Sequence, residues 1–296
     1  MFSIIKRKIR KLLIGGRWHV MYRPVNSQSP FIMAENPPRE FCADPMIIEE
    51  NGDTYIFCEQ FREKDRKGCE GYFKFENGVP VNKGIILERP YHLSYPFVFK
   101  YRGCYYMIPE TSENNTVELY NATSFPNKWE FCRVILKGHD YVDTTVMEEN
   151  GVMTFVTYYT VDDGYVLEKY AFDENLDRIT LLTTIHYKEN IGRGAGQYFM
   201  RDNILYRPSQ NCIRAYGEGM FINKVFSKGT QYKEEIVSEM TLNNTPIQGL
   251  RRKVAMHTYS VSSKYEVIDV FAERFDICFN LGNLLAKKRR VKSLQK

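Results

Sequence analysis

The chain has 296 residues, of which 43% are apolar, and a formal net charge of +5. This apolar content is enough for a sizeable core, and 21 Tyr with 19 Phe are typical of packed β-strands. No apolar run approaches the ~20 residues of a membrane span, and no basic stripe follows the body of the chain. These features argue against a transmembrane protein and predict no nucleic-acid partner.

Two basic segments flank the body of the chain. Residues 1–17 combine a basic run at 6–11 with apolar residues that would share one face of a short helix, and residues 276–296 form a basic tail. The apolar run after the first charges is too short for a secretory signal. The pattern favours peripheral attachment to an anionic surface at the inner membrane face, with a solvated basic terminus as the alternative. Seven Cys residues without Cys-x-x-Cys spacing predict neither a zinc site nor a disulfide framework and favour the cytoplasm.

Residues 18–275 are predicted to form one domain built from a repeated unit. Each unit is a strand, a tight turn and a second strand, and the five copies are 44–59, 95–110, 143–158, 195–210 and 257–271. Tyr95 follows Asp44 by 51 residues, and Asp143 follows it by 99. Asn51-Gly52 in the first copy supplies the positive φ angles of a two-residue hairpin turn.

Weaker strands follow these pairs in the sequence. They lie at 71–75 and 84–88 after the first copy and at 116–120 and 131–136 after the second. Repeated sets of four antiparallel strands are the signature of a β-propeller. The predicted fold is therefore all-β, a five-bladed β-propeller with four-stranded antiparallel blades and short basic terminal segments.

The repeats differ at positions that should line the central channel. The first strands place Asp44, Tyr95, Asp143, Ala195 and His257 at one equivalent position. The second strands place Glu59, Glu110, Tyr158, Gln210 and Ala272 at another, with Arg207 close to Gln210 in the sequence. A purely structural repeat would keep an apolar residue at such positions. Converging carboxylates are the groups that glycosyl chemistry uses as base, acid or charge stabiliser.

Several motifs carry a resemblance to known families. Residues 43–45, Ala-Asp-Pro, resemble the opening of family 43 glycoside hydrolases and their five-bladed relatives, in which this Asp is the general base. The chain more closely resembles the N-terminal-type domain of glucosamine inositolphosphorylceramide transferase and its bacterial homologues. The matching stretches come in family order and are 92–99, 106–111, 118–122, 125–129, 143–145, 194–196, 205–210, 216–217 and 257–258. The resemblance implies sugar transfer, in bacterial surface polysaccharide or glycolipid assembly.

The chain also departs from the hydrolase pattern. The second blade reads Tyr95-Pro96-Phe97, where family 43 hydrolases carry an Asp in a Pro-Asp context. The third blade reads Asp143-Thr144-Thr145, where those enzymes carry the Glu that acts as general acid. The hydrolase triad is incomplete, so simple hydrolysis is disfavoured.

The resulting hypothesis is a glycosyltransferase with a carboxylate-lined axial pocket. Asp44 would be the base for the acceptor hydroxyl, and Glu110 and Asp143 would position the acceptor or balance charge at the anomeric carbon. The remaining candidates are Arg193 and Arg207 for a donor phosphate, His92, Tyr95 and His257 for the shape of the sugar pocket, Gln210 for reading hydroxyls, and Glu59 for support. Each has a structural alternative: the histidines and Tyr95 as buried core groups, and Arg207 as the partner of a blade carboxylate.

The predicted partners are an activated sugar donor and a glycan or lipid-linked acceptor. No glycine-rich nucleotide loop and no Asp-x-Asp motif is present, so the leaving group and any cofactor stay open, and no metal site is predicted. Two other classes remain as alternatives. One is a glycoside hydrolase of the family 43-like type, and the other is a non-catalytic propeller that binds glycans.

Overall fold

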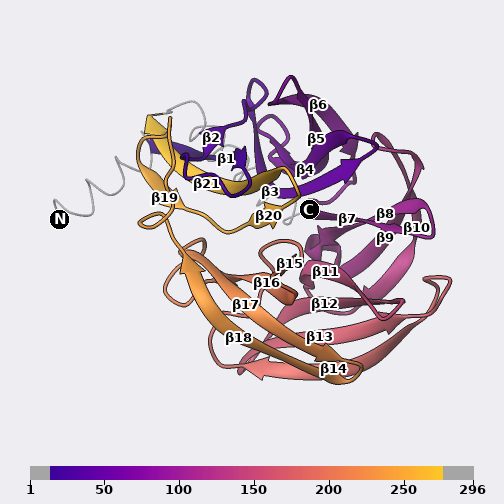
Figure 1. Cartoon of the computed structure of the whole chain (residues 1–296). Coiled ribbons are helices and arrows are strands. Elements are labelled where there is room, and N and C mark those ends of the chain that lie inside the picture. Colours follow the sequence, from indigo (N-terminus) through magenta and orange to yellow (C-terminus); the bar gives the residue numbers. More distant parts are fainter. Residues whose placement is uncertain (1–13, 276–296) are drawn as a thin grey trace, which may run out of the picture.

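The computed structural model describes residues 14–275, which form five antiparallel sheets arranged around a central axis (Figure 1). This confirms the predicted five-bladed β-propeller. The predicted helical face within residues 1–13 and the tail at 276–296 lie outside the described residues. Strand β1 begins at Ile14, so the sheet extends into the segment that the sequence analysis grouped as 1–17.

The first four blades each consist of consecutive strands. Blade 1 contains β3 (Glu40–Glu50), β4 (Asp53–Arg62), β5 (Lys67–Glu76) and β6 (Val79–Leu87). Blade 2 contains β7 (Ser94–Tyr101), β8 (Cys104–Thr111), β9 (Thr116–Ser124) and β10 (Lys128–Lys137). Blade 3 contains β11 (Val142–Glu149), β12 (Val152–Val161), β13 (Gly164–Phe172) and β14 (Ile179–Tyr187). Blade 4 contains β15 (Phe199–Arg201), β16 (Ile204–Asn211), β17 (Gly219–Lys228) and β18 (Gln231–Met240).

Blade 5 is built from both ends of the described chain. It contains β19 (Lys253–Ala255), β20 (Tyr259–Val261), β21 (Tyr265–Phe275), β1 (Ile14–Pro24) and β2 (Ile32–Met33). Strands β1 and β21 pair along their whole length, from Ile14 opposite Phe275 to Pro24 opposite Tyr265. The ring of blades is therefore closed by backbone hydrogen bonds between distant parts of the sequence.

The hairpin turns follow the predicted chemistry. Asn51 and Gly52 both have positive φ, as do Asn150 and Gly151, so each pair fits a two-residue turn that matches the twist of its strands. Asp202 and Asn203 adopt the same sign of φ in the fainter fourth copy. Local sequence therefore sets the connection between the first two strands of these blades.

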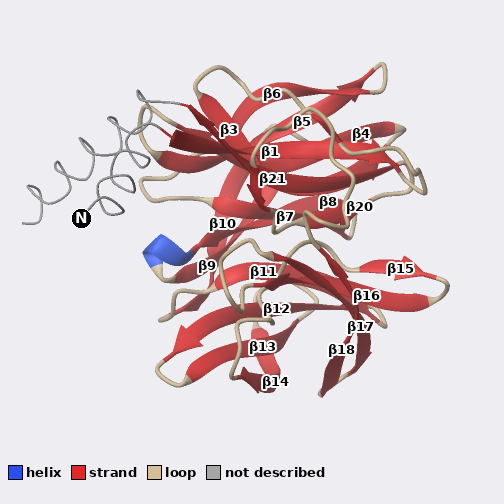
Figure 2. Ribbon diagram, turned by 90° about the vertical axis from the view of Figure 1, so that its left-hand side faces the viewer, coloured by secondary structure: helices blue, strands red, loops and turns tan. Residues whose placement is uncertain are grey.

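The core fills the spaces between neighbouring blades. Alternate residues of β4 show this, because Tyr55 and Phe57 pack toward blade 2 whereas Ile56 and Cys58 pack toward blade 5. Strands dominate the side view in Figure 2, and the one helix of the described residues is the short 3₁₀ turn η1 (Ser112–Asn114). In this part of the chain no helix has the length and apolar character needed to cross a bilayer.

Candidate active site

The first strands of blades 1, 2 and 3 share a local distortion. Their pairing shifts at the same repeat position, which leaves Asp44, Tyr95 and Asp143 with φ of 50°, 48° and 49°. Positive φ is uncommon for residues other than Gly, and its recurrence at β-bulges next to an axis marks a constrained position. The repeat alignment identified these three positions from sequence.

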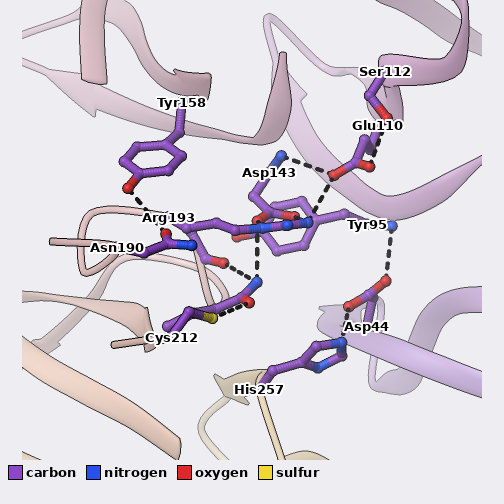
Figure 3. Close-up of polar contacts among 12 residues, drawn as sticks. Asp44, Tyr95, Glu110, Ser112, Asp143, Tyr158, Asn190, Arg193, Cys212 and His257 are labelled. Carbon is purple, nitrogen blue, oxygen red and sulfur yellow. Dashed lines mark hydrogen bonds and ion pairs between the residues drawn. The ribbon is translucent and has the colours of Figure 1, made fainter. Parts of the chain in front are cut away.

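The bulges free backbone N–H groups for bonds between blades. The Asp44 N–H donates to Asp269 Oδ2 at 3.0 Å, and the Tyr95 N–H donates to Asp44 Oδ2 at 3.3 Å. The Asp143 N–H donates to Glu110 Oε2 at 3.3 Å. In each case the acceptor belongs to the preceding blade, so carboxylates with little exposure link blades 5, 1, 2 and 3 around the axis. Figure 3 shows two of these links, from Tyr95 to Asp44 and from Asp143 to Glu110.

Asp44 lies at the end of a chain of buried ionisable groups. His257 faces it, with Nε2 3.6 Å from Asp44 Oδ1, while His257 Nδ1 lies 2.7 Å from Asp269 Oδ2. Thr258 Oγ1 donates to Asp44 Oδ1 at 3.1 Å. Burial raises the pKa of Asp44 to about 6, although the charge of His257 opposes the rise. Asp44 is thus a carboxylate poised to exchange a proton near neutral pH.

The histidine in this chain is held in one orientation. Its ring stacks on Trp18 of β1, with centroids 4.1 Å apart and an interplanar angle of 9°, and Tyr216 meets it edge-on at 5.1 Å. Burial lowers the pKa of His257, but the carboxylates of Asp269 and Asp44 outweigh burial and raise that pKa above its usual value. A charged His257 would stabilise the ionised form of Asp44.

A second cluster surrounds Arg193, from the segment between β14 and β15. Its guanidinium pairs with Asp143 through Nε and lies 3.4 Å from Glu110 Oε2 through an Nη atom. Gln210 Nε2 donates to Asp143 Oδ2 at 3.0 Å, and Ser112 Oγ donates to Glu110 Oε1 at 2.9 Å. Burial raises the pKa of Asp143 to about 8, while the Arg193 charge opposes the rise. The structure therefore brings these predicted residues together (Figure 3).

Tyr95 links three parts of the chain near the axis. Its hydroxyl accepts the Gly196 N–H at 2.8 Å and lies 3.0 Å from Thr145 Oγ1, so it joins blade 2 to blade 3 and to the segment before blade 4. The side chain is fully buried. Tyr95 is therefore a buried link between blades.

The other predicted residues lie in different surroundings. Glu59 is near the axis, with Oε1 3.3 Å from His92 Nε2, and its side chain is 10% exposed. Arg207 is fully buried and pairs with Glu234 of β18. Its guanidinium is enclosed and has no face open to a donor phosphate. Arg207 therefore fits the alternative role, that of partner to a blade carboxylate. Ala272 pairs with Arg17 of β1 and Lys253 of β19, not with the axial carboxylates.

Sequence reasoning missed several residues of this centre. Asp269 accepts N–H groups from Asp44, His257 and Thr258, yet the only signal for it was a single charge within the apolar strand 267–271. Trp18 lies before the first repeat copy, so no alignment of copies points to it. Tyr216, 54% exposed, stands beside Arg193, whose guanidinium carbon is 5.6 Å from the Tyr216 ring centroid.

Asp44, His257 and Asp269 are close enough together to hold a cation. Both oxygens of Asp269 already accept donors, however: the backbone N–H groups of His257 and Thr258 on Oδ1, and the Asp44 N–H with His257 Nδ1 on Oδ2. A cation would have to displace these bonds, so the donor set fits a hydrogen-bonded network better than a metal site.

Access to the axial groups is narrow. The side chains of Asp44 and Glu110 are each 10% exposed, and that of Arg193 is 22% exposed. A separate cavity of about 440 Å³, lined in part by Arg23, Phe199 and Tyr259, contains none of the axial carboxylates. The axial ionisable groups therefore lie apart from this cavity.

Comparison with known proteins gives two kinds of match. A family model described as the N-terminal part of glucosamine inositolphosphorylceramide transferase 1 matches residues 17–257. The Arabidopsis thaliana protein called glucosamine inositolphosphorylceramide transferase 1 is 32% identical over 223 residues, which cover 71% of this chain and 28% of the relative. The protein of that name from Oryza sativa subsp. indica is 29% identical over 201 residues, covering 64% and 26%. The chain thus spans about a quarter of the length of these relatives.

Solved structures match the fold at low identity. An α-L-arabinofuranosidase from Clostridium thermocellum has a TM-score of 0.56 at 10% identity, over 77% of this chain and 81% of that one. A family 117 glycoside hydrolase from Zobellia galactanivorans has a TM-score of 0.55 at 13% identity, over 87% and 90%. These similarities establish the shared architecture. The chemistry has to be argued from the residues of the site, because one fold supports many reactions.

Proposed function

The chain belongs to the family of glucosamine inositolphosphorylceramide transferase 1 N-terminal domains, as its motifs predicted, and from this membership we propose that it is a glycosyltransferase-type enzyme. Its substrates would be an activated sugar donor and a glycan or lipid-linked acceptor, in the assembly of surface polysaccharide or glycolipid. One observation supports this most: Asp44 is turned toward the axis at a strained bulge and backed by His257 and Asp269.

In the proposed reaction Asp44 is the base. Its carboxylate takes the proton of the acceptor hydroxyl as that oxygen attacks the anomeric carbon, and the bond to the leaving group breaks. A charged His257 keeps Asp44 ionised, because its Nε2 faces Asp44 Oδ1 while Nδ1 is held by Asp269. A pKa of about 6 lets Asp44 accept this proton at neutral pH.

The remaining axial groups would bind the substrates. Arg193 presents a partly exposed cation beside Asp143 and Glu110, where it can meet a donor phosphate, while these two carboxyl groups can balance the positive charge that develops at the anomeric carbon. Tyr216 offers an exposed aromatic face on which a sugar ring can stack. Gln210 would position Asp143, because its Nε2 donates to both Asp143 Oδ2 and the Gly194 carbonyl.

The basic segments at 1–17 and 276–296 complete the proposal. Their composition suits attachment to an anionic membrane surface, which would place the enzyme beside a lipid-linked acceptor at the cytoplasmic face. This attachment rests on sequence alone, because residues 1–13 and 276–296 lie outside the described residues.

The test uses the full chain, radiolabelled sugar donors and membrane fractions. Asp44→Asn should lower transfer by about 10²- to 10⁴-fold, the range expected for loss of a general base, while substrate binding persists. Asp163→Asn, at an exposed hairpin turn, is the matched control and should transfer at the wild-type rate. A preliminary thermal-shift screen of nucleotide sugars and lipid-linked acceptors would select the donors.

Three outcomes would contradict the proposal. Full transfer by both Asp44→Asn and Glu110→Gln would show that the axial carboxylates are not the reacting groups. Release of free sugar from a glycan by the wild type, with no transfer product, would indicate a glycoside hydrolase. Glycan binding by the wild type and Asp44→Asn, without turnover by either, would indicate a binding module.

A further inference from the structure

Glu70 on β5 is a buried acid that no part of the mechanism above uses. It is fully enclosed, and neither of its carboxyl oxygens has a hydrogen-bond partner among the described residues. Its Cα lies directly opposite that of Glu59 in the register of β4 and β5, so both side chains leave the same face of the sheet. An unpartnered carboxyl group is costly to bury, and its retention calls for an explanation.

Glu59 connects this buried acid to the axis. It stands opposite Ala43, just before the bulge of blade 1, and Glu110 stands opposite Ser94, just before the bulge of blade 2. The two glutamates therefore occupy equivalent places in neighbouring blades. The Glu59 side chain is 10% exposed and lies close enough to Asp44 and Glu110 to feel their charges, whereas Glu70, on the next strand, is fully enclosed.

The donor that faces Glu59 is a neutral histidine. The Gly68 N–H donates to His92 Nδ1 at 3.0 Å, so this nitrogen carries a lone pair and the ring proton is on Nε2. Nε2 lies 3.3 Å from Glu59 Oε1 and can donate to it without bringing a positive charge. Among the described residues, Glu59 thus has a hydrogen-bond donor nearby but no adjacent cation to hold it ionised.

The surroundings disfavour a negative charge on either glutamate. Burial, reinforced by the charge of Glu59, raises the pKa of Glu70 well above its usual range, and the other charged groups that act on it are Asp44 and Glu110. Burial, reinforced by Asp44, Glu110 and Asp269, raises the pKa of Glu59 in the same way. Asp44, by contrast, has His257 beside it. The Glu59–Glu70 pair thus favours the protonated form, whereas the charge of His257 favours the ionised form of Asp44.

We propose that Glu59 is the general acid of the transfer reaction and that Glu70 is a positioning residue that holds a second proton directly behind it. This inference rests on the proposed function and deepens it. As the bond between the anomeric carbon and the departing oxygen breaks, the Glu59 proton moves to that oxygen, and Asp44 takes the proton of the acceptor hydroxyl as the new bond forms. The Glu70 O–H then donates to the new Glu59 carboxylate. Asp44 returns its proton to solvent, and the pair takes one up, so protons balance over a cycle.

The first experiment measures protonation without any substrate. Full-length protein with ¹³C-labelled Glu carboxyl groups is titrated by NMR. The wild type should show two glutamates that remain protonated well above the usual range of a Glu carboxyl group and titrate in two coupled steps. Glu70→Gln and Glu59→Gln should each leave a single step, whereas Glu76→Gln, at the exposed end of β5, should leave both. Titration of every Glu in the ordinary acidic range would overturn the proposal.

The second experiment separates catalysis from folding. Glu59→Gln should lower kcat about 10²-fold or more with little change in KM. Glu70→Gln should lower kcat by a smaller factor and move the basic limb of the pH–rate profile to lower pH. Glu70→Met should raise Tm while lowering kcat, because it removes an unpartnered buried acid; a structural residue would lose stability instead.

The results also distinguish this inference from the proposed function. Wild-type kcat in Glu59→Gln, or an unmoved pH profile in Glu70→Gln, would overturn the roles assigned here even if Asp44 is essential. Absence of transfer by the wild type with every donor would overturn the proposed function and with it the catalytic role of Glu59. The NMR titration would still show whether the two glutamates hold their protons.

Discussion

The pKa of Asp44 is set by opposing effects of the groups around its carboxylate. Burial raises the pKa of Asp44, since a charge is costly away from water. His257 opposes this effect, and the Tyr95 N–H and Thr258 hydroxyl supply donors that favour the ionised form. The balance leaves a pKa of about 6, which suits a base at neutral pH.

His257→Gln should therefore move the acidic limb of the pH–rate profile. In the wild type this limb should lie near pH 6, because transfer needs Asp44 ionised. Loss of the His257 charge removes the group that lowers the pKa of Asp44, so the limb should move to higher pH and activity at pH 6 should fall severalfold.

The matched control is His186→Gln, because His186 is exposed on β14. Measurement of kcat/KM from pH 5 to pH 8 for both variants and the wild type shows whether the acidic limb moves only in His257→Gln. An unmoved limb in His257→Gln would mean that the histidine only fills space beside Trp18.

The candidate site was predictable from sequence only in part. Subtraction of the repeat positions brought out Asp44, Asp143 and His257, because equivalent residues of a propeller must meet at the axis. It could not bring out Asp269 or Glu70. These residues act through bonds and burial between strands, and neither occupies the repeat position that was compared.

At the scale of the strand, the β-bulge is the feature that positions the axial residues Asp44, Tyr95 and Asp143. In blades 1, 2 and 3 it turns one residue of the first strand into the left-handed region and releases its N–H from the ladder to reach a carboxylate of the preceding blade. The backbone at Gly196 is also tightly packed, since a Cβ there would lie 1.8 Å from the Tyr259 carbonyl oxygen. Backbone as well as side chains is therefore fitted closely around the axis.

Tyr95→Phe should destabilise the fold without changing its shape. The hydroxyl accepts the Gly196 N–H and contacts Thr145 Oγ1, and removing it leaves a buried N–H unpaired, at a cost of about 1–3 kcal/mol. Urea unfolding followed by circular dichroism measures this free energy.

Tyr101→Phe is the control for this loss. Its hydroxyl donates to the Glu174 carbonyl at an exposed site, where water can replace the bond, so the free energy of unfolding should change little. Equal effects of the two substitutions would refute the claim that Tyr95 is a buried link between blades.

At the scale of the whole molecule, closure depends on β1. The strand contributes the length of the β1–β21 ladder and also carries Trp18, which stacks on His257. Five copies of the repeat were enough to predict five blades. The partner of the last copy was not predictable in this way, because residues 14–24 precede the first copy and do not repeat its pattern.

Two truncations separate attachment from closure. A variant lacking residues 1–13 and 287–296 should keep its Tm within a few degrees and lose sedimentation with anionic vesicles, because the proposed membrane contacts are removed. A variant lacking residues 1–24 should lose cooperative unfolding, because β21 then has an unpaired edge.

Neutral vesicles provide the control for charge-dependent attachment. Unchanged sedimentation of the first variant would refute the membrane proposal. Cooperative unfolding at the wild-type Tm in the second variant would show that the ring holds without β1.

The shared fifth blade also fixes when the centre can form during synthesis. Asp44 emerges early from the ribosome, but its acceptor Asp269 follows 225 residues later. At about 5–20 residues per second, that interval lasts of the order of ten to fifty seconds, during which the early blades can fold while their axial carboxylate still lacks its neighbours. A prematurely terminated chain that ends after blade 4 would contain most of the strands and the base itself, yet it would have no intact centre.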